Sequence, residues 1–350
     1  MQTKWIRAKP LFSKIWFFLV FLFLLVVIPL IVVSAWFNWA TAPVSKEGEE
    51  KIFVIELNEG VSSIGERLKK EGLIRDELVF SFYTRFSCEG VSLFDPLSLL
   101  KRQNCLSEKI QAGTFKLSPT DDLATLAGKL TEGKPLDTWA KILEGTRVEE
   151  IAKTLAEKFP FSQEEFLALA QEGYMFPDTY LFKTESTAKE IVTKMRETFD
   201  LKFTQELKDK AAAQNLTLEE AVILASLVER ETRSDDERPV IAGILLKRLR
   251  EGWRLEVDAT IQYALGYDEI GKTWWKKSLT TEDLAVISPY NTRTHSGLPP
   301  GPICNPGLSA LKAVAEPVES EYYFYLHDKE GKVHYGRTLQ EHNANKAKYL

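Results

Sequence analysis

The chain has 350 residues, of which 44% are hydrophobic and 27% charged, and its net charge is −5. This length allows two domains with hydrophobic cores in addition to a membrane segment. Nucleic-acid binding is not expected, because it normally requires a basic surface. A neutral, carbohydrate-like substrate is compatible with this charge balance.

Residues 15–36 form an uncharged apolar run that can cross the roughly 30 Å hydrocarbon core of a bilayer as one helix. A cleavable signal is the alternative, since Ala40-Thr41-Ala42 has the composition of a cleavage site. The apolar region of a signal peptide usually has only about 7–15 residues, which favours an uncleaved anchor.

The charges beside this run predict its orientation. Lysine and arginine occur four times in residues 1–14, whereas residues 37–45 carry no charge. By the positive-inside rule the N-terminus stays in the cytoplasm. The chain after about residue 40 is therefore expected on the far side of the membrane.

Three similar segments follow a polar linker, and each has the pattern of a strand, a turn and a short helix. Each pairs a β-branched or aromatic strand with a helix whose apolar residues lie four apart. Such units cannot bury their apolar faces alone and are expected to pack together. They are residues 52–68, 113–130 and 139–155.

Cys88 and Cys105 bracket an irregular insertion over residues 87–107. An extracytoplasmic domain can be oxidised, but spacing alone leaves open whether these two residues form a disulfide. Cys304 is the third cysteine, and no Cys/His cluster has the spacing of a zinc site. We expect neither a metal nor a cofactor.

Between these landmarks the chain is mainly helical. Helices are predicted at residues 78–86 and 188–210, and the proline and aromatics of residues 173–180 predict a rigid loop. Two short aromatic strands, residues 322–326 and 332–335, predict a late hairpin.

The clearest helix signal begins at Thr217, which with Glu220 has the spacing of a capping box. The following residues are apolar on almost every side, so the helix should be buried. A carboxyl at the end of such a helix is expected to have a raised pKa, as a general acid requires. Glu229 and Glu231 both satisfy this description, and both could instead be solvated residues paired with neighbouring arginines.

Two polar segments after this helix are candidate binding elements. Residues 255–263 include an Asp, a Thr and a Gln at alternate positions, and residues 288–307 are rich in Pro and Gly. A long ordered loop often carries a binding site, although it can also wrap the core.

The order of these motifs resembles the YceG-like family of endolytic murein transglycosylases. The resemblance runs from the apolar segment to the C-terminus. It is carried by Gln111-Ala112-Gly113-Thr114-Phe115, Met175-Phe176-Pro177-Asp178-Thr179-Tyr180, Ala225-Ser226-Leu227-Val228-Glu229-Arg230-Glu231-Thr232, Asp258-x-Thr260-x-x-Tyr263, Tyr290-Asn291-Thr292, Gly297-Leu298-Pro299-Pro300-Gly301-Pro302-Ile303 and Asn305-Pro306-Gly307.

The resemblance implies an α+β protein of the bacterial inner (cytoplasmic) membrane. It would have an N-terminal transmembrane helix, a LysM-like subdomain and a mixed α/β catalytic domain outside the cytoplasm. The expected divisions are a cytoplasmic tail at 1–14, the transmembrane helix at 15–36, a linker at 37–50, the LysM-like subdomain at 51–135 and the catalytic domain at 136–350.

The resemblance also implies the reaction. The family cleaves the bond between N-acetylmuramic acid and N-acetylglucosamine in nascent glycan strands and leaves 1,6-anhydro ends. Its single catalytic glutamate is the first Glu of V-E-[KR]-E-T, which is Glu229 here. Peptidoglycan strands are the expected substrate, and membrane-bound synthases are candidate partners. The candidate sugar-positioning residues are Ser226, Asp258, Thr260, Gln262, Tyr290, Asn291 and Thr292.

Two other readings remain. The chain could be a non-catalytic peptidoglycan-binding scaffold for synthases, although an intact Glu229 motif argues for an enzyme. It could also be a hydrolase in which Asp258 activates water. The chain departs from the family pattern at Glu256, where Gln is common, and at Ala259, where Pro is common.

Overall fold

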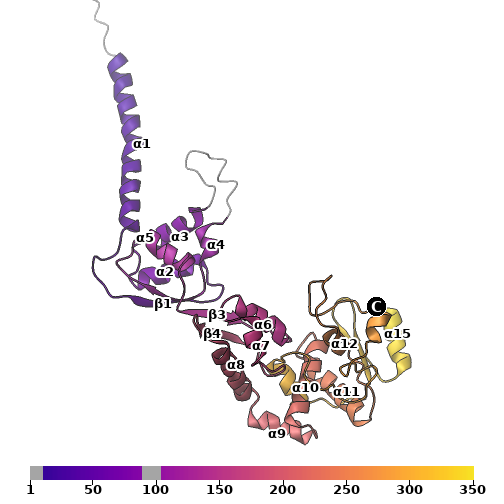
Figure 1. The fold of residues 1–350 in the computed structure, drawn as a ribbon. Helices are drawn as coiled ribbons and strands as arrows, with labels where there is room; N and C mark the ends of the chain where they lie inside the picture. The colour runs from indigo at the N-terminus through magenta and orange to yellow at the C-terminus, as the bar shows by residue number, and fades with distance from the viewer. Residues whose placement is uncertain (1–10, 89–103) are drawn as a thin grey trace, which may run out of the picture. The chain divides into compact units, whose positions relative to one another are not determined.

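The computed structural model describes residues 11–88 and 104–350. It divides into two compact units, residues 1–138 and 139–350 (Figure 1). The division lies within strand β3 (Asp137–Lys141). Strands and helices occur in both units, which confirms the predicted α+β class.

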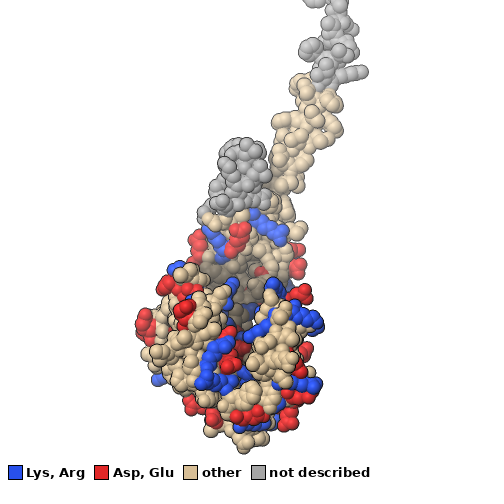
Figure 2. All heavy atoms as spheres, turned by 90° about the vertical axis from the view of Figure 1, so that its right-hand side faces the viewer, with Lys and Arg blue, Asp and Glu red and all other residues tan. Residues whose placement is uncertain are grey.

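The first unit begins with the long helix α1 (Leu11–Thr41), in which Phe18–Thr41 is apolar and long enough to span a membrane. In Figure 2, residues 16–41 of this helix show no charged side chains, whereas Lys, Arg, Asp and Glu are mixed over the rest of the visible surface. The helix continues past the predicted end at Trp36. Its last turn is held by unit 1, because Ala40 is buried in the core of that unit.

The rest of unit 1 contains the first two of the three predicted strand–turn–helix segments, at residues 52–68 and 113–130. The third segment, formed by β3 and a helix at residues 148–156, belongs mainly to unit 2. β1 pairs antiparallel with β2 from Lys51↔Leu117 to Ile55↔Gly113, and β2 pairs antiparallel with the start of β3. Phe53, Phe80 and Leu126 belong to the core beneath these strands. The elements are β1 (Lys51–Ile55), α2 (Val61–Lys70), α3 (Glu77–Phe86), α4 (Leu106–Lys109), β2 (Gly113–Leu117) and α5 (Leu123–Thr131).

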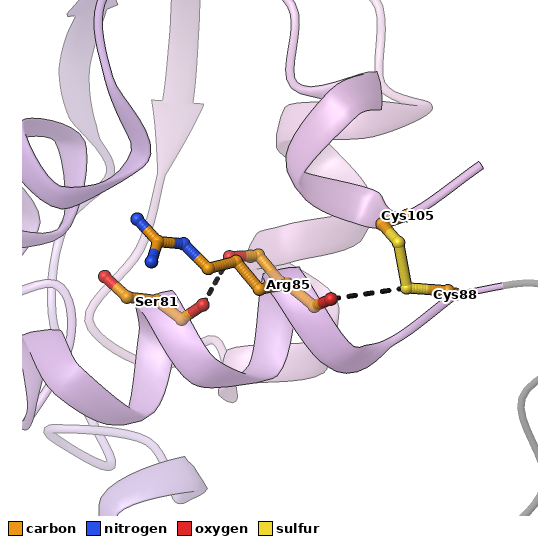
Figure 3. The surroundings of a disulfide bond; sticks show 5 residues. Ser81, Arg85, Cys88 and Cys105 are labelled. Carbon is orange, nitrogen blue, oxygen red and sulfur yellow. Dashed lines mark hydrogen bonds between the residues drawn. A yellow bond between two sulfur atoms is a disulfide. The ribbon is translucent and has the colours of Figure 1, made fainter. Parts of the chain in front are cut away.

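Cys88 and Cys105 form a disulfide, which the spacing had left open (Figure 3). Cys88 follows the end of α3, and Cys105 is the N-cap residue of α4. The bond therefore ties α3 to α4. Most of the predicted irregular insertion, residues 89–103, lies outside the described residues.

The second unit is mainly helical. Strand β4 lies next to β3, and the predicted late hairpin is formed by β5 and β6, paired from Phe324↔Gly336 to His327↔Val333. The elements are α6 (Val148–Ala156), α7 (Gln163–Leu167), β4 (Thr179–Lys183), α8 (Ala188–Lys202), α9 (Gln205–Ala213), α10 (Leu218–Glu231), α11 (Arg238–Arg250), α12 (Asp258–Leu265), α13 (Thr281–Leu284), α14 (Leu308–Ala315), β5 (Phe324–His327), β6 (Val333–Gly336) and α15 (Leu339–Tyr349).

The helix predicted at residues 188–210 is in fact two helices, α8 and α9. The chain leaves helical geometry at Phe203, and Thr204 then caps α9 by accepting a hydrogen bond from the backbone N–H of Leu207. A threonine inside the predicted helix was thus a start signal for a new one.

Helix α10 is the centre of unit 2. Thr217 and Glu220 form the predicted capping box, and nine consecutive residues, 221–229, are buried. Helices α9, α11 and α14 pack around it. A helix enclosed in this way holds the groups on its last turn at fixed positions, and that turn carries Glu229.

Candidate active site

Glu229 is the last fully buried residue of α10, with only 8% of its surface exposed. Its carboxyl accepts two hydrogen bonds from outside its own helix. Oε1 accepts from Nη2 of Arg238 at 2.8 Å, and Oε2 accepts from the backbone N–H of Gly307 at 2.9 Å. Each oxygen therefore has a donor, which a nearly buried carboxylate requires.

These two donors come from elements that pack on α10. Arg238 is the first residue of α11, and Gly307 is the N-cap residue of α14. The backbone N–H groups at the start of a helix attract negative charge. Arg238 also forms an ion pair with Asp235, which lies in the turn between α10 and α11. Neither Arg238 nor Asp235 was among the site residues predicted from the sequence.

The side chain of Glu144, which carries a second carboxyl, lies directly against Gly307. A Cβ atom added to Gly307 would lie 2.1 Å from Oε1 of Glu144. The Glu144 side chain can therefore keep this position only because residue 307 has no side chain. Burial raises the pKa of Glu144, and the charge of Glu229 raises it further, while Arg238 opposes the shift. Within the described part of the chain, no hydrogen-bond donor reaches the Glu144 carboxyl.

Asn305 holds the loop that ends at Gly307. Its Oδ1 accepts from the backbone N–H of Met175 at 2.8 Å, and its Nδ2 donates to the Thr146 carbonyl and, at 2.8 Å, to Oε1 of Glu172. Burial raises the pKa of Glu172 to about 8. The Asn-Pro-Gly motif thus connects the site to the residue just before the predicted 173–180 loop.

Aromatic rings and arginines form a neighbouring cluster. The guanidinium of Arg230 lies 3.7 Å from the ring centre of Trp275, and that of Arg147 lies 4.1 Å from Tyr263 and 4.5 Å from Trp274. The rings of Tyr263 and Tyr290 are 4.8 Å apart. Trp274, Trp275, Tyr263 and Tyr290 are all partly exposed. Flat apolar rings with polar edges are suited to contact with sugars.

The hydroxyl and amide groups of four predicted sugar-positioning residues are used inside the protein. Ser226 donates to the Ile223 carbonyl and accepts from the N–H of Ile303, and the Thr260 and Thr292 hydroxyls are 3.0 Å apart. Nδ2 of Asn291 donates to two backbone carbonyls. All four side chains are at most 2% exposed. They hold the segments around the site together.

The other three predicted residues are reachable from solvent. Asp258 is exposed and paired with Arg293 at 2.6 Å, and Gln262 is partly exposed and donates to the Lys276 carbonyl. Tyr290 belongs to the aromatic cluster. Gln262 lies near the same cluster, because Lys276 directly follows Trp275.

The structure places Glu231 in different surroundings from Glu229. Together with Asp258 it lines a separate cavity of about 360 Å³, and its Oε2 accepts a hydrogen bond of 2.8 Å from the Tyr325 hydroxyl. Burial raises the pKa of Glu231 to about 7. Helical spacing could not choose between the two carboxyls, but their partners differ completely. Within the described residues, no group of three His, Cys, Asp or Glu side chains could hold a metal ion.

Comparisons with known proteins agree with the motif order. The sequence profile of the YceG-like family matches residues 53–348. An endolytic murein transglycosylase of Bacillus subtilis (strain 168) is 27% identical over 339 residues, which cover 88% of this chain and 87% of that protein. One from Streptococcus pneumoniae (serotype 2, strain D39) is 27% identical over 345 residues, covering 86% of this chain and 59% of that protein.

A solved structure is similar as well. The crystal structure of a putative yceG-like protein from Listeria monocytogenes superposes with a TM-score of 0.59 at 27% identity. The alignment covers 85% of this chain and 98% of the Listeria chain.

Proposed function

The chain belongs to the YceG-like family, and we propose that it is an endolytic murein transglycosylase that cuts glycan strands of peptidoglycan. The observation that carries this proposal is the placement of Glu229. It lies in the family motif, at the end of a buried helix, with Arg238 and the Gly307 amide fixing its carboxyl.

In the proposed mechanism Glu229 acts twice. Its protonated carboxyl donates a proton to the glycosidic oxygen between N-acetylmuramic acid and N-acetylglucosamine as an oxocarbenium-like state forms. The resulting carboxylate then accepts the proton of the C6 hydroxyl of the muramic acid, whose oxygen bonds to C1 and closes the 1,6-anhydro ring. The proton count balances, and no water is consumed.

The groups around Glu229 suit the carboxylate stage of this cycle. Arg238 and the Gly307 N–H stabilise the carboxylate that exists between the two steps, because both donate to it. Gln262 and Tyr290 contact the sugar chain beside the aromatic cluster, and the buried Ser226, Thr260, Asn291 and Thr292 keep the surrounding loops in position. Asp258, which lines the separate cavity with Glu231 and pairs with Arg293, would reach only a more distant part of the strand.

Membrane attachment completes the proposal. Helix α1 anchors the chain in the bacterial inner membrane, with residues 1–14 in the cytoplasm and the chain after α1 on the other side. Unit 1, with its strand–turn–helix segments, is LysM-like, and membrane-bound peptidoglycan synthases are the expected partners. Anchoring would keep the enzyme close to newly made strands.

The test is product analysis with the full chain in lipid nanodiscs and purified peptidoglycan, read by mass spectrometry. Wild type should give fragments one water lighter than hydrolysis fragments, and Glu229→Gln should give none. Glu231→Gln is the matched control, because it removes a buried carboxyl from the same helix turn, and it should keep the anhydro product.

Other outcomes identify the alternatives. Reducing ends in place of anhydro ends would indicate a hydrolase with a second carboxylate. No products from any variant, on a substrate that another muramidase cleaves, would leave the non-catalytic scaffold as the better description.

A further inference from the structure

Helix α3 of unit 1 presents an apolar stripe to the outside. Leu78, Phe82 and Phe86 recur every four residues and are 69%, 54% and 37% exposed. The Phe82 and Phe86 rings stack with centres 4.2 Å apart. The opposite face of the helix, with Phe80 and Thr84, is already buried in the unit. The exposed stripe therefore requires a separate explanation.

This stripe forms one wall of a groove whose other wall is α1. The groove has a volume of about 520 Å³, and Ser81 and Arg85 are the polar residues in its lining. Its apolar lining comes from the two helices, namely Val33, Trp36 and Phe37 of α1 and Leu78, Val79, Phe82 and Phe86 of α3.

The C-terminal end of α1 packs against the rest of unit 1, and these contacts hold α1 and α3 beside each other. Ala40 is 2% exposed, in the core of the unit. The guanidinium of Arg75 donates to the Pro43 carbonyl and lies 5.3 Å from the ring centre of Trp39. Three contacts therefore hold the junction between α1 and the rest of unit 1: the burial of Ala40 and the contacts of Arg75 with Pro43 and Trp39.

The length of α1 indicates at which level of the bilayer the groove lies. The apolar segment Phe18–Thr41 has 24 residues, or about 36 Å of helix at 1.5 Å per residue, against a hydrocarbon core of roughly 30 Å. Its last turn therefore emerges from the core. Val33 remains among acyl chains, and Trp36 and Trp39 fall at the level where aromatic residues are enriched.

We propose that α3 lies in the membrane surface beside α1, with Leu78, Phe82 and Phe86 inserted among the phospholipid acyl chains of the leaflet that faces unit 1. The wall formed by α1 identifies this occupant, because Val33 and Trp36 already contact lipid when α1 spans the bilayer. Amphipathic helices bind membranes in this way, by burial of an apolar face at the interface.

Arg85 is compatible with this position. It is exposed beside Phe86, and its guanidinium donates to the Ser62 hydroxyl, so its charged end can stay at headgroup level while the helix body is in lipid. The disulfide just after α3 fixes the end of the helix to α4. Unit 1 would then rest on the membrane through two helices. This inference depends on α1 spanning the bilayer and not on catalysis.

Spin labels on the full chain test the proposal. The background variant is Cys304→Ser, since the other two cysteines are joined in the disulfide. Single cysteines replace Leu78 or Phe82, Val33 as a reference inside the span, and Glu66, an exposed residue of α2, as a matched control. The labelled protein is placed in phosphatidylethanolamine–phosphatidylglycerol liposomes. Collision rates with oxygen, which partitions into lipid, and with a water-soluble nickel chelate are then measured.

The expected result is that labels at positions 78 and 82 behave like the label at 33, with oxygen collisions dominant, while the label at 66 shows the reverse. Nickel collisions at 78 and 82 equal to those at 66 would overturn the proposal. Low collision rates with both reagents would also overturn it, because they mean a protein cover. Spectral broadening that disappears on dilution with unlabelled chain would identify a second copy as that cover. A water-accessible label at 33 would remove the premise that α1 spans the bilayer and so overturn the proposal as well.

Discussion

The guanidinium of Arg238 donates a hydrogen bond of 2.8 Å to Glu229, and the two side chains are only 10% and 5% exposed. Two charges removed from water are stable only when other hydrogen bonds satisfy them as well. Gly307 supplies such a bond to Glu229, and Asp235 accepts one from Arg238. This pair therefore joins the last turn of α10 to the first residue of α11 and fixes the direction of the carboxyl.

Removal of the arginine should be costly. In Arg238→Ala the Glu229 carboxylate stays buried without its charge partner, and we expect the free energy of unfolding to fall by about 3 kcal/mol at neutral pH, together with loss of activity. Urea unfolding of unit 2 measures this change. Asp235→Asn is the control, since Asp235 is 76% exposed on the same guanidinium and should cost less than about 1 kcal/mol. Equal losses of unfolding free energy in the two variants would show that the buried Arg238–Glu229 pair stabilises unit 2 no more than the exposed Arg238–Asp235 pair does.

Gly307 should be sensitive to a single methyl group, through Glu144. The backbone φ of Gly307 is −77°, which any residue adopts, so the cost of Gly307→Ala comes from the contact of 2.1 Å with Oε1 of Glu144 and not from strain. We expect a loss of about 1–2 kcal/mol, typical of overpacking. In a Glu144→Ala background the same substitution should cost almost nothing, because the clashing carboxyl is gone.

A double-mutant cycle on these two positions isolates the contact. A coupling energy near zero would mean that Glu144 moves away freely and does not belong to the site. Activity of Gly307→Ala measured in parallel then shows whether displacement of the Glu144 carboxyl from Glu229 affects turnover.

Local signals in the sequence were enough to locate α10 and the two carboxyls at its end, those of Glu229 and Glu231. The capping box at Thr217 and the apolar run up to Val228, interrupted only by Ser226, depend on neighbours within a few residues, so they can be recognised without the fold. The same holds for the strand–turn–helix segments of unit 1 and the late hairpin.

The partners of Glu229 had no such signal. Arg238 follows after a turn and Gly307 is 78 positions away, and both reach the carboxyl only because α11 and α14 pack on α10. Polarity does not identify the partner either: the Ser226 hydroxyl and the Asn291 amide form hydrogen bonds with buried backbone groups. A sequence shows that a residue can form a hydrogen bond but not which partner it finds.

The Cys88–Cys105 disulfide should stabilise unit 1 alone. It closes a loop with a sequence separation of 17, for which chain entropy gives about 3 kcal/mol. Replacement of both cysteines by serine should lower the unfolding temperature of unit 1 and leave that of unit 2 unchanged. Cys304 is a free thiol buried in unit 2, and Cys304→Ser is the matched control. A reductant that lowers the stability of wild type but not of the double serine variant would establish the same point without mutation.

Glu172 should make unit 2 less stable as the pH rises. Burial raises the pKa of its carboxyl to about 8, against an ordinary value of 4.5. The folded state therefore binds a proton that the unfolded state releases. The stabilisation from this group is complete below about pH 4.5 and is lost as the pH rises to 8, at up to about 1.4 kcal/mol per pH unit.

Glu172→Gln replaces the titratable carboxyl with an amide, so the proton uptake is lost. The amide oxygen can still accept hydrogen bonds from Asn305 Nδ2 and from the Val148 N–H. The variant should match wild type near pH 4.5 and become progressively more stable than wild type up to pH 8.5. Chemical denaturation at a series of pH values gives the two curves, with Glu164→Gln, an exposed carboxyl of α7, as the control. Parallel curves for wild type and Glu172→Gln would mean that Glu172 is ionised in the folded protein throughout this range. In that case its hydrogen bond to Asn305 would be charge-assisted, and Glu172→Gln should weaken the loop that presents Gly307 to Glu229 at every pH.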